Sequence, residues 1–137
     1  IMQELFNNIK KFKNKVALHD SNSKKVRYSE LYNLKKKFIK IFPKSSVILF
    51  LIKNTNDSIS SYISLFDLKV IKIILDDAIN YEYFLNLKVK YEPNFIICSE
   101  KKMNQLKIEN YNFLNGDYCF FKINDKIKKI NEINSVL

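Results

Sequence analysis

The segment "SVILFLIKNTNDSISSYISLFDLKVIKIIL", residues 46–75, decides the fold of this chain. Its two ends, 46–52 and 70–75, are apolar at nearly every position, which is typical of strands that are covered on both faces. Between them, apolar side chains recur at helical spacing: Ile59, Tyr62, Ile63 and Phe66. The segment therefore predicts a strand, a crossover helix and a second, parallel strand.

The same alternation continues downstream. Residues 81–91 predict a helix that Pro93 ends, and "NFIIC", residues 94–98, predicts a third buried strand. Beyond residue 100 the pattern weakens to a short helix over 103–108, a strand over 117–123 and an apolar segment that begins at Ile133. These elements together predict an α/β fold, a mainly parallel sheet flanked by helices.

The sequence before residue 46 predicts a different local structure. Residues 2–12 have the apolar spacing of an amphipathic helix, and 16–19 and 25–28 predict a short β-hairpin across a polar turn. Ser29 stands where the N-cap of the next helix is expected, and that helix should end before Pro43. Residues 1–137 are therefore predicted to form a single α/β domain, with the regular pattern over 3–100 and a less regular part over 101–137.

Composition restricts the possible partners. The chain has 137 residues, the size of one domain, and a formal net charge of +10. A basic chain can bind nucleic acid or an anionic membrane. However, the only arginine is Arg27, and specific recognition of phosphate or guanine favours arginine over lysine. No specific nucleic acid is therefore expected. The longest apolar run, Val47–Ile52, is too short to span a bilayer, and the expected location is the reducing cytoplasm.

Polar residues that could carry chemistry follow the predicted strands. Open α/β sheets bind ligands at the carboxyl ends of their strands, here the loops 53–57, 76–80 and 99–103. In the second loop, Asp76 and Asp77 could hold Mg²⁺. The favoured alternative is that one of them caps the helix near Tyr81 while the other is solvated. In the first loop, Asn56 or Asp57 could cap the helix that follows.

The remaining candidates give no complete site. His19 could act as an acid–base group, but alone on a short strand it is more often structural. Cys98 and Cys119 form no zinc-binding pattern and are expected to be buried or half-buried free thiols. Gly116 is the only glycine, so neither a G-x-G-x-x-G fingerprint nor a Walker loop exists. The sequence therefore assigns no catalytic, cofactor-binding or metal-binding residue.

Three stretches carry a resemblance to a known family. "KVALHDSNSKKVRYSELYN" (15–33), "SSVILFLIKNTNDSISSYISLFDLKVIKIILDD" (45–77) and "INYEYFLNLKVKYEPNFIICSE" (79–100) follow one another as in the entry of the adenylate-forming superfamily. That superfamily comprises acyl-CoA synthetases, adenylation domains of peptide synthetases and luciferases. The resemblance covers residues 3 to about 100 and lies in order and pattern. It departs at Leu68-Lys69, where the family usually has a glycine, and at Ile74-Leu75-Asp76, where a proline is usual.

The resemblance implies an N-terminal piece of an ATP-dependent ligase. The full enzyme would join a carboxylic acid to AMP with loss of pyrophosphate, then pass the acyl group to a thiol of coenzyme A or a carrier-protein pantetheine, with Mg²⁺ present. "NEINSVL", residues 131–137, looks like the start of the strand before the phosphate loop. The family's ATP loop, adenine motif, ribose-binding Asp and catalytic Lys would all follow it, so the piece alone is expected to be inactive.

One alternative stays open, a self-contained basic α/β binding module with at most weak nucleic-acid binding. A piece of a larger enzyme has the remainder of its own polypeptide as partner. It should also expose a strand edge or an apolar face, so a homodimer, or residues 124–137 exchanged between copies, is expected.

Overall fold

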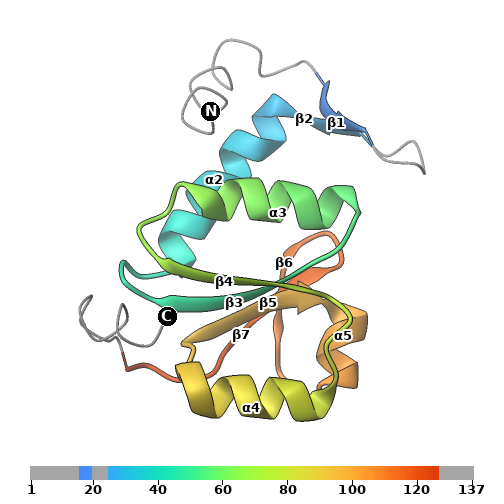
Figure 1. Ribbon diagram of the computed structural model, residues 1–137. Helices are drawn as coiled ribbons and strands as arrows, with labels where there is room; N and C mark the ends of the chain where they lie inside the picture. The colour runs from blue at the N-terminus through green and yellow to red at the C-terminus, as the bar shows by residue number, and fades with distance from the viewer. Residues whose placement is uncertain (1–15, 20–24, 127–137) are drawn as a thin grey trace.

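The computed structural model describes residues 16–19 and 25–126 of the chain, with side chains from Val26 onward. It contains a two-stranded antiparallel sheet and a five-stranded sheet flanked by helices (Figure 1). The small sheet pairs β1 (Val16–His19) with β2 (Lys25–Arg27), which confirms the predicted hairpin. The helix predicted over 2–12 and the segment that begins at Ile133 lie outside the described residues.

The five-stranded sheet has the order β4-β3-β5-β7-β6. Strands β3 (Val47–Ile52), β4 (Ile71–Asp76) and β5 (Phe95–Ser99) run parallel, as predicted, and β3 lies between the other two. Strands β6 (Asn112–Asn115) and β7 (Tyr118–Lys122) form a hairpin whose second strand pairs antiparallel with β5. The α/β prediction is confirmed, but these two strands make the sheet mixed.

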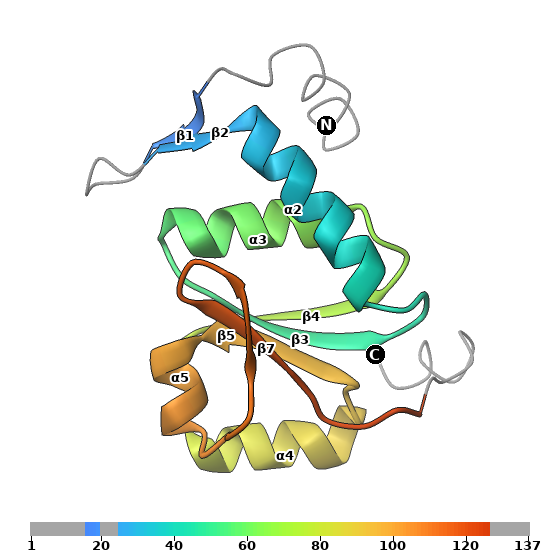
Figure 2. The same cartoon turned by 180° about the vertical axis from the view of Figure 1, so that it is seen from behind.

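Helices cover both faces of this sheet (Figure 2). On one face lie α2 (Tyr28–Ile41) and α3 (Asn56–Phe66), and on the other lie α4 (Tyr81–Tyr91) and the short α5 (Glu100–Gln105). Side chains of the strands alternate between the two layers, because successive residues of a strand point to opposite faces. In β3, Ile48 and Phe50 belong to the first core, and Leu49 and Leu51 belong to the second. The near-continuous apolar run thus reflects burial on both sides.

A third, smaller cluster connects the hairpin to the helices. Val26 of β2, Leu31 of α2 and Ile63 of α3 are buried together. Helix α2 begins two residues earlier than predicted, with Arg27 at its N-cap. The prediction that Ser29 caps this helix is wrong, because Ser29 already lies in the first turn. Glu30 serves the helix end instead, since its Oε1 accepts the backbone N–H of Arg27 at 3.2 Å.

The elements after residue 100 differ from the prediction in two respects. Helix α5 starts directly after β5, three residues before the predicted 103–108 helix, because Ser99 caps it by accepting the backbone N–H of Lys102. Strand β6 was not predicted, since among its four residues only Leu114 is buried and no apolar alternation marks it. Strand β7 confirms the strand predicted over 117–123.

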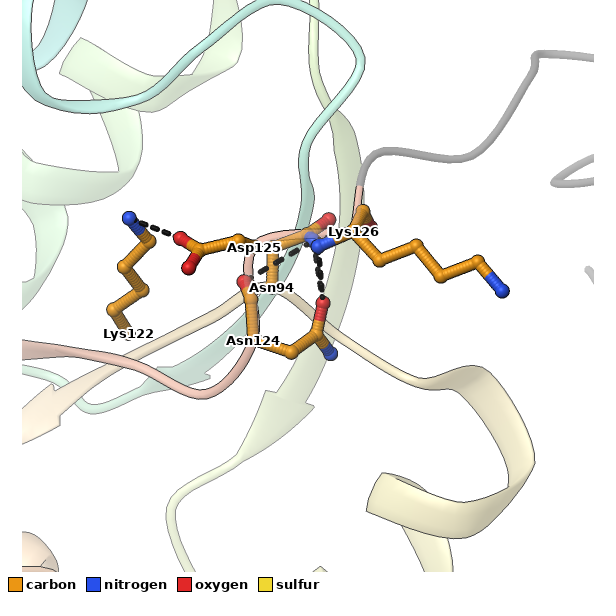
Figure 3. Close-up of polar contacts among 5 residues, drawn as sticks. All are labelled: Asn94, Lys122, Asn124, Asp125 and Lys126. Carbon is orange, nitrogen blue, oxygen red and sulfur yellow. Dashed lines mark hydrogen bonds and ion pairs between the residues drawn. The ribbon is translucent and has the colours of Figure 1, made fainter.

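A buried amide holds together three segments at the amino ends of β3 and β5 (Figure 3). Asn94 is 1% exposed, and its Oδ1 accepts the backbone N–H of Val47 at 2.8 Å. Its Nδ2 donates to Asn124 Oδ1 at 2.9 Å and to the carbonyl of Lys126 at 2.7 Å. Asn124 Nδ2 in turn donates to the carbonyl of Pro93 at 2.9 Å. The chain that leaves β7 is therefore fixed against the start of β5.

We expect Asn94→Ala to destabilise the fold by about 2–4 kcal/mol, because it leaves the buried N–H of Val47 and the carbonyl of Lys126 without their partners. Urea denaturation followed by circular dichroism measures this change. Asn112→Ala, on the exposed side of β6, is the matched control and should change stability by no more than about 0.5 kcal/mol. An equal effect of the two substitutions would contradict the role of Asn94.

Candidate functional site

The candidate site is the edge of the sheet where the parallel strands end. The loops after β3, β4 and β5 meet there, as predicted, and the β6–β7 turn joins them beside the first turn of α3 (Figure 2). In open α/β sheets this edge commonly binds ligands. Its capacity to do so depends on which polar groups remain open to a ligand.

The first turn of α3 is occupied by side chains of the chain itself. Thr55 caps the helix by accepting the backbone N–H of Ser58 at 3.3 Å, so the prediction that Asn56 or Asp57 caps it is wrong. Asp57 lies in the first turn instead, and its Oδ2 accepts the backbone N–H of Asp117 at 3.1 Å. Ser58 Oγ accepts the backbone N–H of Lys53 at 2.8 Å.

The β6–β7 turn closes over the same helix end. Asn115 Nδ2 donates to the carbonyl of Asp57 at 3.0 Å and to Ser60 Oγ at 2.7 Å. Gly116 has φ +58° and packs so tightly against Asp57 that a Cβ there would collide with the carboxylate. Only glycine combines this left-handed backbone with the close contact. The single glycine thus shapes a turn and cradles no phosphate.

The other two helix N-termini at this edge are also capped. Asn80 caps α4 by accepting the backbone N–H of Tyr83 at 2.8 Å, and Ser99 caps α5. Each helix carries a carboxylate in its first turn, Asp57 in α3, Glu82 in α4 and Glu100 in α5. A carboxylate in the first turn lies at the positive end of the helix dipole, where a phosphate would otherwise bind, and its negative charge repels a phosphate.

Asp76 is the last residue of β4 and Asp77 follows it directly, and both make contacts with backbone groups. Asp76 Oδ1 accepts the backbone N–H of Ala78 at 2.8 Å, and the backbone N–H of Asp77 donates to the carbonyl of Ile52 at 3.1 Å. Neither caps α4, so that part of the prediction is wrong. Within residues 26–126 no group of three or more His, Cys, Asp and Glu side chains gathers as metal ligands would. The Mg²⁺ interpretation gains no support here.

Asp77 is the most perturbed carboxylate of this edge. Its Oδ1 is buried and accepts no hydrogen bond. Desolvation raises the pKa of Asp77, while the ammonium groups of Lys102 and Lys53 lower it by a smaller amount. Lys102 itself is buried at 7% exposure, and its Nζ donates to the carbonyl of Ile79 at 3.1 Å. The sequence did not single out Lys102, because a lysine in a polar helix is normally solvated.

The two cysteines lie directly opposite each other. Cys98 of β5 and Cys119 of β7 are paired in register, are free thiols and are fully buried. Burial raises the pKa of Cys98 and raises the pKa of Cys119 to about 12. The prediction of two buried or half-buried free thiols is confirmed. For His19 the structure gives the backbone position in β1, opposite Lys25, and its acid–base role stays a prediction.

A cavity beside this edge is small, and most of its polar side chains make hydrogen bonds within the chain. It has a volume of about 240 Å³, whereas ligand pockets usually have about 300–1,000 Å³. Its wall comes from β2, α2, α3 and the β6–β7 turn: Val26, Glu30, Leu31, Leu34, Asp57, Ser60, Asn115 and Gly116. Glu30, Asp57 and Asn115 all make the hydrogen bonds described above. The cavity therefore presents few open polar groups to a ligand.

Many lysines of the described residues make internal contacts. Lys35 pairs with Asp67 at 2.8 Å, and Lys37 Nζ donates to the carbonyl of Leu114 at 2.8 Å. Lys72 Nζ donates to the carbonyl of Leu68 at 2.9 Å. Lys35 and Lys37 lie in α2 and Lys72 lies in β4, and their ammonium groups contact a carboxylate or backbone carbonyls. Over the described ranges, none of the helices is long and apolar enough to cross a membrane.

We expect both thiols to react slowly in the folded chain. Because burial lifts the pKa of Cys119 from 9.0 to about 12, its thiolate fraction falls about a thousandfold at neutral pH. The rate of thiol reaction is measured at pH 8 from the absorbance of the product that a chromogenic disulfide reagent releases. Both thiols should react rapidly when urea unfolds the chain. Rapid reaction of the folded chain would contradict the buried position.

We expect Asp77→Asn to stabilise the chain at neutral pH and to leave stability unchanged at low pH. The pKa of Asp77 is raised in the folded state, so the folded chain binds the proton of this carboxyl more tightly than the unfolded chain. The free energy of unfolding that this difference contributes is lost as pH rises through the raised pKa. Urea denaturation over about pH 3–8 covers that window. Glu109→Gln, at an exposed carboxylate outside this edge, controls for the loss of one negative charge, and a pH dependence that both variants share would contradict the role of Asp77.

No protein-family model matches the sequence, and no curated protein matches it significantly. Solved structures do match. The chain is similar to a luciferase-like enzyme from the nonluminescent mealworm Zophobas morio, with 18% identity over 80% of this chain and 29% of that chain and a TM-score of 0.57. It is similar to VinN in complex with L-aspartate, with 17% identity, coverage of 78% and 29% and a TM-score of 0.61.

A third similar structure is the N-terminal subdomain of NpsA from Klebsiella oxytoca in complex with anthranilyl-AMSN. It has 14% identity, coverage of 68% and 26% and a TM-score of 0.53. The chain thus spans less than a third of the length of these three proteins. At these identities the similarity shows the fold alone, which this chain shares with part of the luciferase-like enzyme, of VinN and of the NpsA N-terminal subdomain, and such a fold is what the resemblance in the sequence predicts.

Proposed function

We propose that this chain is the N-terminal structural portion of an ATP-dependent adenylate-forming ligase. The observation that carries the proposal is the fold itself. A hairpin, the helix α2 and the strand order β4-β3-β5 occur here in a chain that matches under a third of each similar structure. The match to the N-terminal subdomain of NpsA supports the same position in the larger fold.

The proposed whole enzyme would join a carboxylic acid to AMP, release pyrophosphate and transfer the acyl group to a thiol of coenzyme A or a carrier-protein pantetheine. ATP, Mg²⁺ and the thiol would be bound by the remainder of the polypeptide. This portion would supply the frame, because the residues at its carboxyl edge bond to one another. Two buried free thiols suit the reducing cytoplasm that we propose as its location.

The alternative of an independent basic module rests on net charge. Nucleic-acid affinity that comes from charge needs lysines that are free to neutralise phosphates. Lys35, Lys37 and Lys72 instead contact a carboxylate or backbone carbonyls of the chain itself. The ligase portion is therefore the better supported proposal, and any binding of this chain to DNA is proposed to be weak and non-specific.

We expect the 137-residue chain to show no ATP binding tighter than a dissociation constant of about 10 μM, equivalent to roughly −7 kcal/mol. The physical reason is that its own side chains cap the three helix N-termini at the carboxyl edge. Isothermal titration calorimetry with ATP and Mg²⁺ is the measurement. Tighter, saturable binding would mean that this portion carries a nucleotide site of its own.

The proposed function predicts a polypeptide longer than residues 1–137, and the test is made at this position and on that longer polypeptide. Its coding sequence should contain a Ser/Thr/Gly-rich loop that ends in lysine soon after this position. The longer polypeptide should catalyse ATP–pyrophosphate exchange that depends on an added carboxylic acid. A stop codon at this position, or absence of exchange with every acid of a broad panel, would overturn the proposal.

A further inference from the structure

Strand β4 forms one lateral edge of the five-stranded sheet (Figure 1). It pairs with β3 in an unbroken register from Ile71 opposite Val47 to Asp76 opposite Ile52. Among the described residues no strand pairs with its other side. Its first five residues are half-buried, and it contains neither a proline nor a bulge. A straight edge of this kind offers unpaired N–H and C=O groups to another strand.

The opposite edge, β6, is protected in the way that natural proteins protect edges. Its pairing with β7 is interrupted between Phe113 and Asn115, and the ammonium of Lys37 donates a hydrogen bond to the carbonyl of Leu114. Bulges and lysines are devices that prevent edge-to-edge pairing. Strand β4 lacks a bulge, and its single lysine is Lys72. The two edges of the sheet are therefore not equivalent.

The backbone contacts of β4 identify the groups that face outward. The N–H of Ile71 donates to the carbonyl of Ser46 at 2.8 Å, and the N–H of Asp77 donates to the carbonyl of Ile52 at 3.1 Å. In a parallel ladder, alternate residues of a strand bond to the same neighbour. The backbone N–H and C=O groups of the odd-numbered residues 71–77 therefore point toward β3. Those of Lys72, Ile74 and Asp76 point away from the sheet.

These three residues form a self-complementary series. When a second copy approaches antiparallel, with Ile74 opposite Ile74 on a two-fold axis, each Lys72 lies opposite Asp76 of the other copy. Residues that face each other this way exchange both of their N–H···O bonds and bring their side chains close. A register shifted by two residues would place Lys72 opposite Ile74 and lose the charge pairs. We propose that β4 is a homodimerisation strand that pairs with a second copy in this register.

The surroundings of Lys72 favour the approach of a carboxylate. Its side chain is half-buried, its Nζ donates to the carbonyl of Leu68, and it lies 5.9 Å from the ring centre of Phe66. Desolvation lowers the pKa of Lys72, and Asp67 compensates this only in part. Asp76 is exposed, so it can supply the second negative charge across the axis. On the other face, Ile73 would lie opposite Leu75 of the second copy.

The expected dimer is weak. Contact along one strand buries less area than the roughly 1,200–2,000 Å² of stable interfaces, so a dissociation constant between about 10 μM and 1 mM is expected. Sedimentation equilibrium of the 137-residue chain over this concentration range should show the mass-average rising from monomer toward dimer. Because the charge pairs are partly exposed, raising the salt from about 0.05 M to 0.5 M should weaken the dimer.

Charge reversal tests the register. Lys72→Asp and Asp76→Lys should each weaken homodimerisation at least about tenfold, because each places like charges opposite each other twice. An equimolar mixture of the two variants should dimerise again, since every pair across the axis then joins opposite charges. This mixture also shows that both variants are folded. Lys40→Asp, an exposed lysine of α2, is the control for net charge and should dimerise as the parent does.

Three results would overturn the proposal. The first is a parent chain that remains monomeric at every concentration, which is expected if the edge pairs only with another strand of a longer polypeptide. The parent would dimerise, but neither single reversal would weaken the dimer, which would place the interface elsewhere. The mixture of the two reversed variants would remain monomeric although circular dichroism shows both to be folded.

Discussion

The structure depends on the burial of β3 on both of its faces. Its first five residues are buried, and alternate side chains enter different cores. A strand of this kind must have a neighbour on each side and a helical layer on each face. The crossovers through α3 and α4 meet this requirement, since one leads to β4 and the other leads past β3 to β5. The rest of the domain is arranged around this one strand.

The same constraint explains why the carboxyl edge serves as frame. The helices that cover β3 and its neighbours must satisfy their first N–H groups at that edge. Thr55, Asn80 and Ser99 do so from within the chain, and Asp57 holds the β6–β7 turn against α3. A phosphate site would need these N–H groups open. The fold is therefore stabilised by the groups that a nucleotide site would otherwise use.

The sequence predicts the elements whose burial leaves a pattern, and it misses those that depend on distant contacts. Strands β3, β4 and β5 were predicted because continuous apolar runs mark strands that are covered on both faces. Strand β6 has one buried side chain and leaves no such pattern. Asn94 and Lys102 look like surface residues, yet they are buried because partners at residues 47, 124 and 79 are brought to them by the fold. No local spacing could reveal these contacts.

The four sides of the five-stranded sheet differ in what they can still bind. Asn94 ties the amino ends of β3 and β5 to the chain that leaves β7. Capping side chains and Asn115 fill the carboxyl ends. A bulge and Lys37 protect the β6 edge. In the five-stranded sheet, β4 is the edge strand with regular pairing whose outward backbone groups are paired with no described strand. Backbone groups that already have hydrogen-bond partners cannot bind another strand, whereas those of an open edge can. The β4 edge is therefore the side at which this domain can pair with a second polypeptide.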